Sequence, residues 1–122
     1  MDTKSGIRGI EPVLPSQNII RDVEWYEQYT GFEYSSGDKM YAVLKRESQF
    51  IHLQWHAGND DDPLLDGSVI KIFVHDITPF FEEFVKRGTI QSEKLIKNTP
   101  WGTHEFSFYD LNKNAIFFVQ DV

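Results

Sequence analysis

The sequence predicts a single α+β domain made of two βαβββ modules. Each half of the chain opens with an extended run, continues with an amphipathic helix and ends in strand-like runs. The helix sequences DVEWYEQYTGF and ITPFFEEFVKRG resemble each other weakly, which indicates an internal repeat. The length of 122 residues suits one domain with a real core. We therefore place module one at residues 7–56, a polar, acidic linker at 57–67 and module two at 68–122.

The first module is predicted to start with an edge strand and a helix. The run GIEPVLPS at 9–16 is extended but contains two prolines, which is typical of a strand at a sheet edge. In NIIRDVEWYEQYTGF, apolar residues recur at helical spacing, Asn18 or Ser16 can cap the helix and Gly31 can end it. Three strand-like runs follow, FEYSS, MYAVLKR and QFIHLQW, with turn residues between them.

The second module is predicted to repeat this order. SVIKIFVHD is rich in β-branched residues and reads as a strand. DITPFFEEFVKRG reads as a helix that Asp76 caps and Gly88 ends. Three further strands are expected at EKLIKN (93–98), HEFSFYD (104–110) and AIFFVQD (115–121), with the turn LNKN between the last two.

Composition narrows the classes of function. Twelve basic and nineteen acidic residues give a net charge of −7, which repels nucleic-acid phosphates and attracts cationic ligands, or merely keeps the protein in solution. The absence of cysteine excludes disulfides, thiolate metal sites and a cysteine nucleophile. No apolar run approaches the ~20 residues of a membrane span, and no signal-like stretch opens the chain. We expect a cytoplasmic protein without nucleic-acid or membrane partners.

Four stretches carry a resemblance to a known superfamily. They are PVLPSQNIIRDVEWYEQYTGFE, YAVLKRESQFIHLQW, FVHDITPFFEEFVKRG and PWGTHEFSFYDLNKNAIFFVQ. In this order the chain is similar to the vicinal oxygen chelate superfamily, which includes glyoxalases, dioxygenases and bleomycin-resistance proteins. LPS and PWGT look most like the bleomycin-resistance branch. The resemblance implies curved mixed sheets around a shared cavity, and a homodimer whose cavities use modules of both chains. It leaves the function open, because one fold carries binders and enzymes alike.

The resemblance also places four metal-ligand positions, of which only two hold side chains that can ligate. The positions fall on Glu11, His52, Val69 and Phe117. A catalytic divalent metal needs about three protein ligands. Glu11 and His52 are therefore weak metal candidates, and we expect no metal and no other cofactor. His56 cannot complete the site, because four residues of strand hold it about 13 Å from His52.

Other chemical signals are weaker still. The sequence has no nucleophile elbow and no phosphate-cradling loop. Three histidines are expected to be surface or hydrogen-bonded residues, and two acidic pairs are expected on solvated helix faces. These are His56, His75 and His104, and the pairs Glu24–Glu27 and Glu82–Glu83.

Strand alternation from the aligned positions predicts the side chains that line the cavity. Most are apolar and a few are polar, as in small-molecule sites. The set is Glu11, Val13, His52, Gln54, Val69, Lys71, Phe73, Phe117 and Val119. Lys71 would oppose a cationic ligand unless Glu11 pairs with it.

Two aromatic residues match a feature of bleomycin-resistance proteins, which hold the flat bithiazole tail of the drug between two rings. Trp101 of the PWGT corner is one, and Tyr41, with Met40 beside it, is the other. Stacking on a ring or placing a cation over its face is worth ~0.5–2 kcal/mol. Asp60, Asp61 and Asp62 of the linker add long-range attraction. The alternative is that both rings pack against their own sheets.

These observations favour a metal-independent protein that sequesters a flat, cationic, bleomycin-like small molecule in a cavity at a homodimer interface. The first alternative is a metal-dependent enzyme of the glyoxalase or dioxygenase type, with Glu11 and His52 completed by other ligands. The second is an interaction module with an occluded cavity. Because Phe117 stands where a carboxylate ligand belongs, the last hairpin is expected to form a pocket wall.

Overall fold

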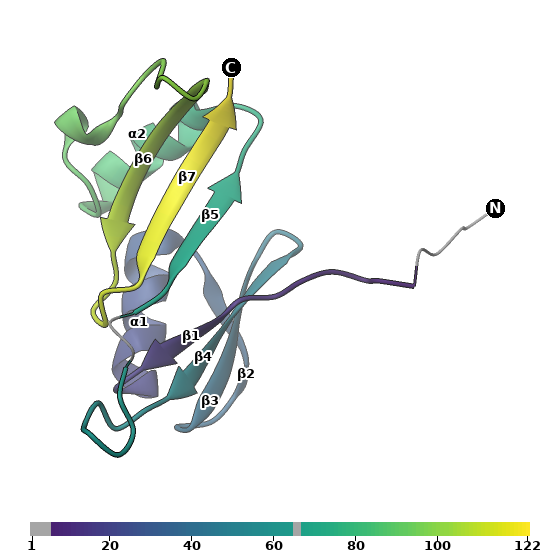
Figure 1. The fold of residues 1–122 in the computed structure, drawn as a ribbon, viewed down its shortest axis with the longest axis vertical. Helices are drawn as coiled ribbons and strands as arrows, with labels where there is room; N and C mark the ends of the chain where they lie inside the picture. The colour runs from purple at the N-terminus through teal and green to yellow at the C-terminus, as the bar shows by residue number, and fades with distance from the viewer. Residues whose placement is uncertain (1–5, 65–66) are drawn as a thin grey trace.

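The computed structural model describes residues 6–64 and 67–122 as two sheets, each covered by one helix. Figure 1 shows the sheets one above the other along the long axis, with module two at the top and residues 6–12 extending away from β1. Residues 65–66 of the predicted linker lie outside the described residues, as do residues 1–5. In the described ranges, no helix has the length and apolar character that crossing a membrane requires.

Module one has the predicted order of elements. It consists of β1 (Val13–Ser16), α1 (Ile19–Thr30), β2 (Glu33–Gly37), β3 (Tyr41–Arg46) and β4 (Gln49–Trp55). The sheet order is β1-β4-β3-β2, with β1 parallel to β4 and the other pairs antiparallel. The side chain of Asn18 caps α1 by accepting the N–H of Arg21, and Gly31 ends it at a φ of 73°.

Module two has one strand fewer than predicted. It consists of β5 (Val69–Phe73), α2 (Ile77–Arg87), the 3-10 helix η1 (Ser92–Lys94), β6 (Thr103–Tyr109) and β7 (Ala115–Asp121), and its sheet order is β5-β7-β6. The prediction of a strand at 93–98 is wrong, because only Ile96 pairs, in an isolated bridge with Glu105. Asn98 then has a positive φ of 54° and gives its N–H to the ring of His104, which ends the pairing.

Apolar residues from both modules form one core between the helices and the inner sheet faces. The predicted alternation along β4 is confirmed, since Ile51 and Leu53 are buried whereas Gln54 is exposed. The largest fully buried side chains include Tyr26, Phe84, Phe106 and Phe118. The opposite, helix-free face of each sheet is therefore not part of this core.

A buried polar cluster joins α1 of module one to the turn at 110–114 of module two. The Tyr26 hydroxyl donates to Asp110 at 2.6 Å, and the Asn114 amide donates to the same carboxylate oxygen at 2.7 Å. The Asn112 amide donates to Asp22 at 2.6 Å. Burial and the Asp110 carboxylate raise the pKa of Tyr26 well above its ordinary value. The cluster fixes the two modules relative to each other through satisfied buried groups.

Candidate functional site

Tyr41, His52 and Glu11 lie together on the helix-free face of module one. In the sheet register, His52 of β4 is opposite Val13 of β1 and Val43 of β3. The alternation of strand side chains brings Glu11 and Tyr41 to the same face from either side. The Tyr41 hydroxyl lies 2.6 Å from Nδ1 of His52, and Nε2 of His52 lies 2.7 Å from Oε1 of Glu11.

Electrostatics determine the direction of these hydrogen bonds. The hydrogen bond from His52, reinforced by Arg8 at 3.0 Å from the other carboxylate oxygen, holds the pKa of Glu11 below its usual range. Glu11 is therefore an ionised acceptor, so the proton lies on Nε2 of His52. In the neutral imidazole Nδ1 is then an acceptor, and the Tyr41 hydroxyl donates to it.

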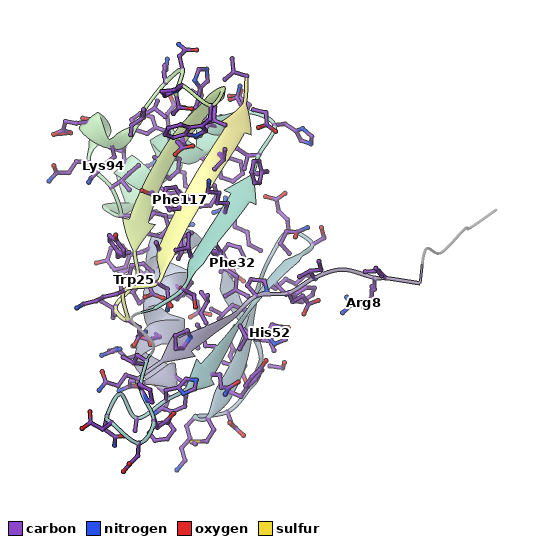
Figure 2. All side chains as sticks on the ribbon, viewed as in Figure 1. Arg8, Trp25, Phe32, His52, Lys94 and Phe117 are labelled. Carbon is purple, nitrogen blue, oxygen red and sulfur yellow. The ribbon has the colours of Figure 1, made fainter. Side chains whose placement is uncertain are left out.

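This arrangement does not fit a divalent metal. His52 uses both ring nitrogens for hydrogen bonds, and both oxygens of Glu11 are engaged by His52 and Arg8. The other two aligned positions hold Val69 and Phe117, which lie on the sheet of module two; Figure 2 shows Phe117 and His52 on different sheets. Within residues 6–64 and 67–122, no three His, Asp or Glu side chains gather in a group suited to a metal.

Two further predicted site residues lie beside Tyr41. Met40 is about half exposed. Gln54 is exposed and lies opposite Tyr41 in the register of β3 and β4. Val13 and Gln54, opposite His52 and Tyr41 in the register, give this face a mixed polar and apolar surface, which suits contact with an amphipathic molecule.

The helix-free face of module two is aromatic and largely open. Phe73 is 62% exposed and Val69 is 65% exposed. Lys71 holds its ammonium 5.6 Å from the ring centre of Phe117. Within the chain, Glu11 contacts Arg8 and His52. Val119, on the same strand as Phe117, is only 1% exposed and is closed to a ligand.

Trp101 presents its ring at the corner that precedes β6. The indole is 65% exposed, and its N–H donates to Oε2 of Glu105 at 3.2 Å. The Thr103 hydroxyl donates to the same oxygen at 2.8 Å. Glu105 is only 7% exposed, so the N–H edge of the exposed ring is held by a buried carboxylate. Sequence analysis missed Glu105, although its two-residue spacing from Thr103 places both side chains on one face of a strand.

A cleft of about 740 Å³ separates the modules beside the edge strand β5. Of the predicted site residues, only Lys71 and Phe73 line it. Its other walls include Ile10, Phe32, Phe50 and Phe80. Neither Tyr41 nor Trp101 lines this cleft; Tyr41 lies on β3 of module one, and Trp101 lies in the turn before β6 of module two.

The remaining charged candidates have structural roles. His56 lies 2.7 Å from Asp62, and that hydrogen bond, with a backbone N–H from Ala57, lowers the pKa of Asp62. His104 accepts a backbone hydrogen bond, as expected for a structural histidine. The expectation that Glu83 is simply solvated is wrong, because both of its carboxylate oxygens bond to Arg46 of module one.

Comparison with solved structures identifies the architecture. A bleomycin-binding protein crystallised with bleomycin superposes with a TM-score of 0.77 over 95% of this chain and 100% of its own, at 19% identity. The chain has the fold of the bleomycin-binding proteins. The bleomycin-binding protein of Streptomyces verticillus, bound to copper(II)-bleomycin, matches with a TM-score of 0.75 over 94% of this chain and 97% of its own, at 21% identity.

The bleomycin-binding fold also relates the chain to a resistance determinant. The bleomycin resistance determinant encoded on the transposon Tn5 matches with a TM-score of 0.74 over 94% of this chain and 98% of its own, at 18% identity. No family model and no curated protein sequence matches the chain. At such identities the likeness establishes the shared fold, and the ligand has to be argued from the side chains.

Proposed function

We propose that the protein binds a flat, cationic small molecule of the bleomycin type, without a metal of its own, and sequesters it. The observation that carries this proposal is the exposed ring of Trp101, whose N–H edge is held by the buried carboxylate of Glu105. A planar ring attracts a flat ligand by stacking and a cation by its face, each worth ~0.5–2 kcal/mol. A carboxylate at the edge of the ring adds to the attraction for positive charge.

A second copy of the chain completes the proposed site. Tyr41 and Trp101 are both suited to face a flat ligand, but they belong to different modules of one chain, Tyr41 to β3 and Trp101 to the turn before β6. The helix-free face of module two exposes Phe73 and Val69 along the edge strand β5. Burying these residues against the Tyr41 face of a partner would remove apolar area from water and bring the two aromatic residues to one cavity. A closed homodimer would hold two such cavities.

The alternative of a glyoxalase- or dioxygenase-type metal enzyme has less support. It needs Glu11 and His52 as metal ligands. The oxygens of Glu11 already bond to His52 and Arg8, and the ring nitrogens of His52 already bond to Glu11 and Tyr41. The binding proposal uses these residues as they stand, as a polar part of the cavity wall.

The test is a calorimetric titration of chelator-treated protein with metal-free bleomycin. Saturable binding at micromolar concentration or tighter is expected, with a loss of about tenfold in Trp101→Ala, because the stacking surface is removed. Trp101→Phe is the matched control, since it keeps a ring and loses only the indole N–H, and it is expected to retain most of the affinity. Absence of heat up to high micromolar bleomycin, or equal binding by Trp101→Ala, would reject the proposed ligand or the proposed site.

A further inference from the structure

The hydroxyl of Tyr41 ends a chain of three hydrogen-bonded side chains. Tyr41 Oη lies 2.6 Å from His52 Nδ1, and His52 Nε2 lies 2.7 Å from Glu11 Oε1. The three residues come from β3, from β4 and from the segment before β1, so the sheet itself sets their spacing. About a fifth of each of the His52 and Glu11 side chains is exposed, which leaves the group accessible to a small molecule.

The hydrogen bonds place each group of this relay where a nucleophile needs it. When Nε2 of His52 donates to Glu11, Nδ1 faces the Tyr41 hydroxyl as an acceptor. A nucleophile, a base within hydrogen-bond reach and a third group that orients the base are the geometric signature of an activated nucleophile. Here the hydroxyl belongs to a tyrosine.

We infer that Tyr41 is a nucleophile that accepts acyl or sulfonyl groups from small electrophiles, with His52 as its base. Tyr41 Oη attacks the electrophilic carbon or sulfur, and its proton passes to Nδ1 of His52. The leaving group departs with the electrons of its bond, and the imidazolium is stabilised by Glu11. The product is an O-acyl or O-sulfonyl tyrosine. The inference concerns one chain and does not rest on the proposed binding of bleomycin.

Other tyrosines provide an internal comparison, because exposure and hydrogen bonding predict opposite orders of reactivity for them and Tyr41. Tyr34 is 50% exposed, and its hydroxyl donates to the backbone carbonyl of Gly37 at 2.7 Å. Tyr109 is 69% exposed. A backbone carbonyl cannot take up the proton during attack, whereas an imidazole can. Exposure alone predicts faster modification of Tyr34 and Tyr109, and the relay predicts faster modification of the half-buried Tyr41.

The experiment treats the full chain with phenylmethanesulfonyl fluoride, which releases fluoride, and follows each tyrosine peptide by mass spectrometry. Tyr41 is expected to be modified at least about tenfold faster than Tyr34 or Tyr109, in line with the range of general-base assistance. Tyr41→Phe removes the fast phase, and the control Tyr34→Phe leaves it unchanged.

His52→Ala is expected to slow the modification of Tyr41 to the rate of Tyr34. Free imidazole is expected to restore it in this variant and not in Tyr41→Phe, a rescue that a purely structural role of His52 would not give. The inference is overturned if modification follows exposure in the unaltered protein, or if His52→Ala reacts at the original rate. If His52→Ala does not fold, the order of rates in the unaltered chain still decides.

Discussion

The indole N–H of Trp101 donates to the buried carboxylate of Glu105, 3.2 Å away, and this bond anchors the edge of an exposed ring. Thr103 donates to the same carboxylate oxygen at 2.8 Å. The two hydrogen bonds fix the position of this nearly buried carboxylate beside the ring. If the proposed ligand is a flat cation, the carboxylate should contribute to its binding.

Glu105→Gln is expected to weaken the binding of bleomycin about fivefold, equivalent to ~1 kcal/mol. The amide oxygen of Gln can still accept the N–H of Trp101, so the ring keeps its orientation while the negative charge is lost. Calorimetric titration provides the measurement. The matched control is Glu93→Gln, which removes the same charge from the exposed 3-10 helix η1. Equal losses in the two variants would mean that only the overall charge of the protein matters.

A cavity shared between two copies predicts complementation between inactive variants. Tyr41→Ala and Trp101→Ala chains are each expected to bind bleomycin poorly. When they are unfolded and refolded together, half of the dimers are mixed, and each mixed dimer has one intact cavity of two, so about a quarter of the sites are expected to recover. The measurement is the stoichiometry of tight binding. If no tight binding sites are recovered, both residues belong to a cavity within one chain or to no cavity.

Local sequence patterns predicted most of the fold because strand alternation and helix caps depend on near neighbours. Asn18, Asp76 and the two helix-ending glycines have their predicted roles. The strand at 93–98 was wrong because its pairing depends on β6, and the chain turns away after one bridge at Ile96. Two adjacent apolar residues, Leu95 and Ile96, also gave no alternation that would have supported a strand.

The candidate site was less predictable, because its geometry depends on pairs that are distant in the sequence. Glu11 and His52 were singled out by resemblance as metal candidates, yet in the structure they bond to each other. The contact of His52 with Tyr41 follows from the register of β3 and β4, which the sequence did not specify. The charge of Glu105 gave no sign that its side chain is buried, because that burial depends on the corner at Trp101.

The ion pair between Arg46 and Glu83 predicts a loss of stability in acid. Arg46 of β3 bonds both oxygens of Glu83 on α2, at 2.6 and 2.9 Å, and thus links the modules. Burial raises the pKa of Glu83, but the hydrogen bonds from Arg46 and Arg87 outweigh it and lower the pKa from 4.5. A carboxyl group whose pKa is lower in the folded than in the unfolded state stabilises the fold when the pH is above its unfolded-state pKa. This stabilisation is lost as the pH falls through the folded-state pKa.

Glu83→Gln is therefore expected to lower the free energy of unfolding by about 1–3 kcal/mol near neutral pH and by less below about pH 4. Urea unfolding across this pH range provides the measurement. Glu82→Gln, an exposed neighbour on the same helix, is the control and is expected to change little. A pH-independent difference between Glu83→Gln and the unaltered protein would contradict the assignment.

Lys113→Gly is expected to stabilise the turn between β6 and β7. Lys113 has a φ of 64°, a left-handed conformation that favours glycine. Relief of this strain is expected to raise the free energy of unfolding by about 0.5–1 kcal/mol, less the entropy that glycine adds to the unfolded chain. Lys39→Gly is the control, because the φ of Lys39 is not positive, and it should not stabilise. A destabilised Lys113→Gly would show that the lysine side chain itself holds the turn.

The bond between Tyr26 and Asp110 predicts a loss of stability in alkali. Burial, then the Asp110 carboxylate, raises the pKa of Tyr26 well above 10.0. Because the pKa of Tyr26 is higher in the folded than in the unfolded state, its full stabilisation is present when the pH is below the unfolded-state pKa near 10. This stabilisation is lost as the pH rises above that pKa. Tyr26→Phe is expected to cost about 1–3 kcal/mol at neutral pH, because a buried hydrogen bond to a charged group is removed. Above pH 10 the difference from the unaltered protein should shrink, as measured by urea unfolding. Tyr34→Phe, which removes an exposed hydroxyl, should show no such convergence; if it does, general alkaline denaturation rather than Tyr26 is responsible.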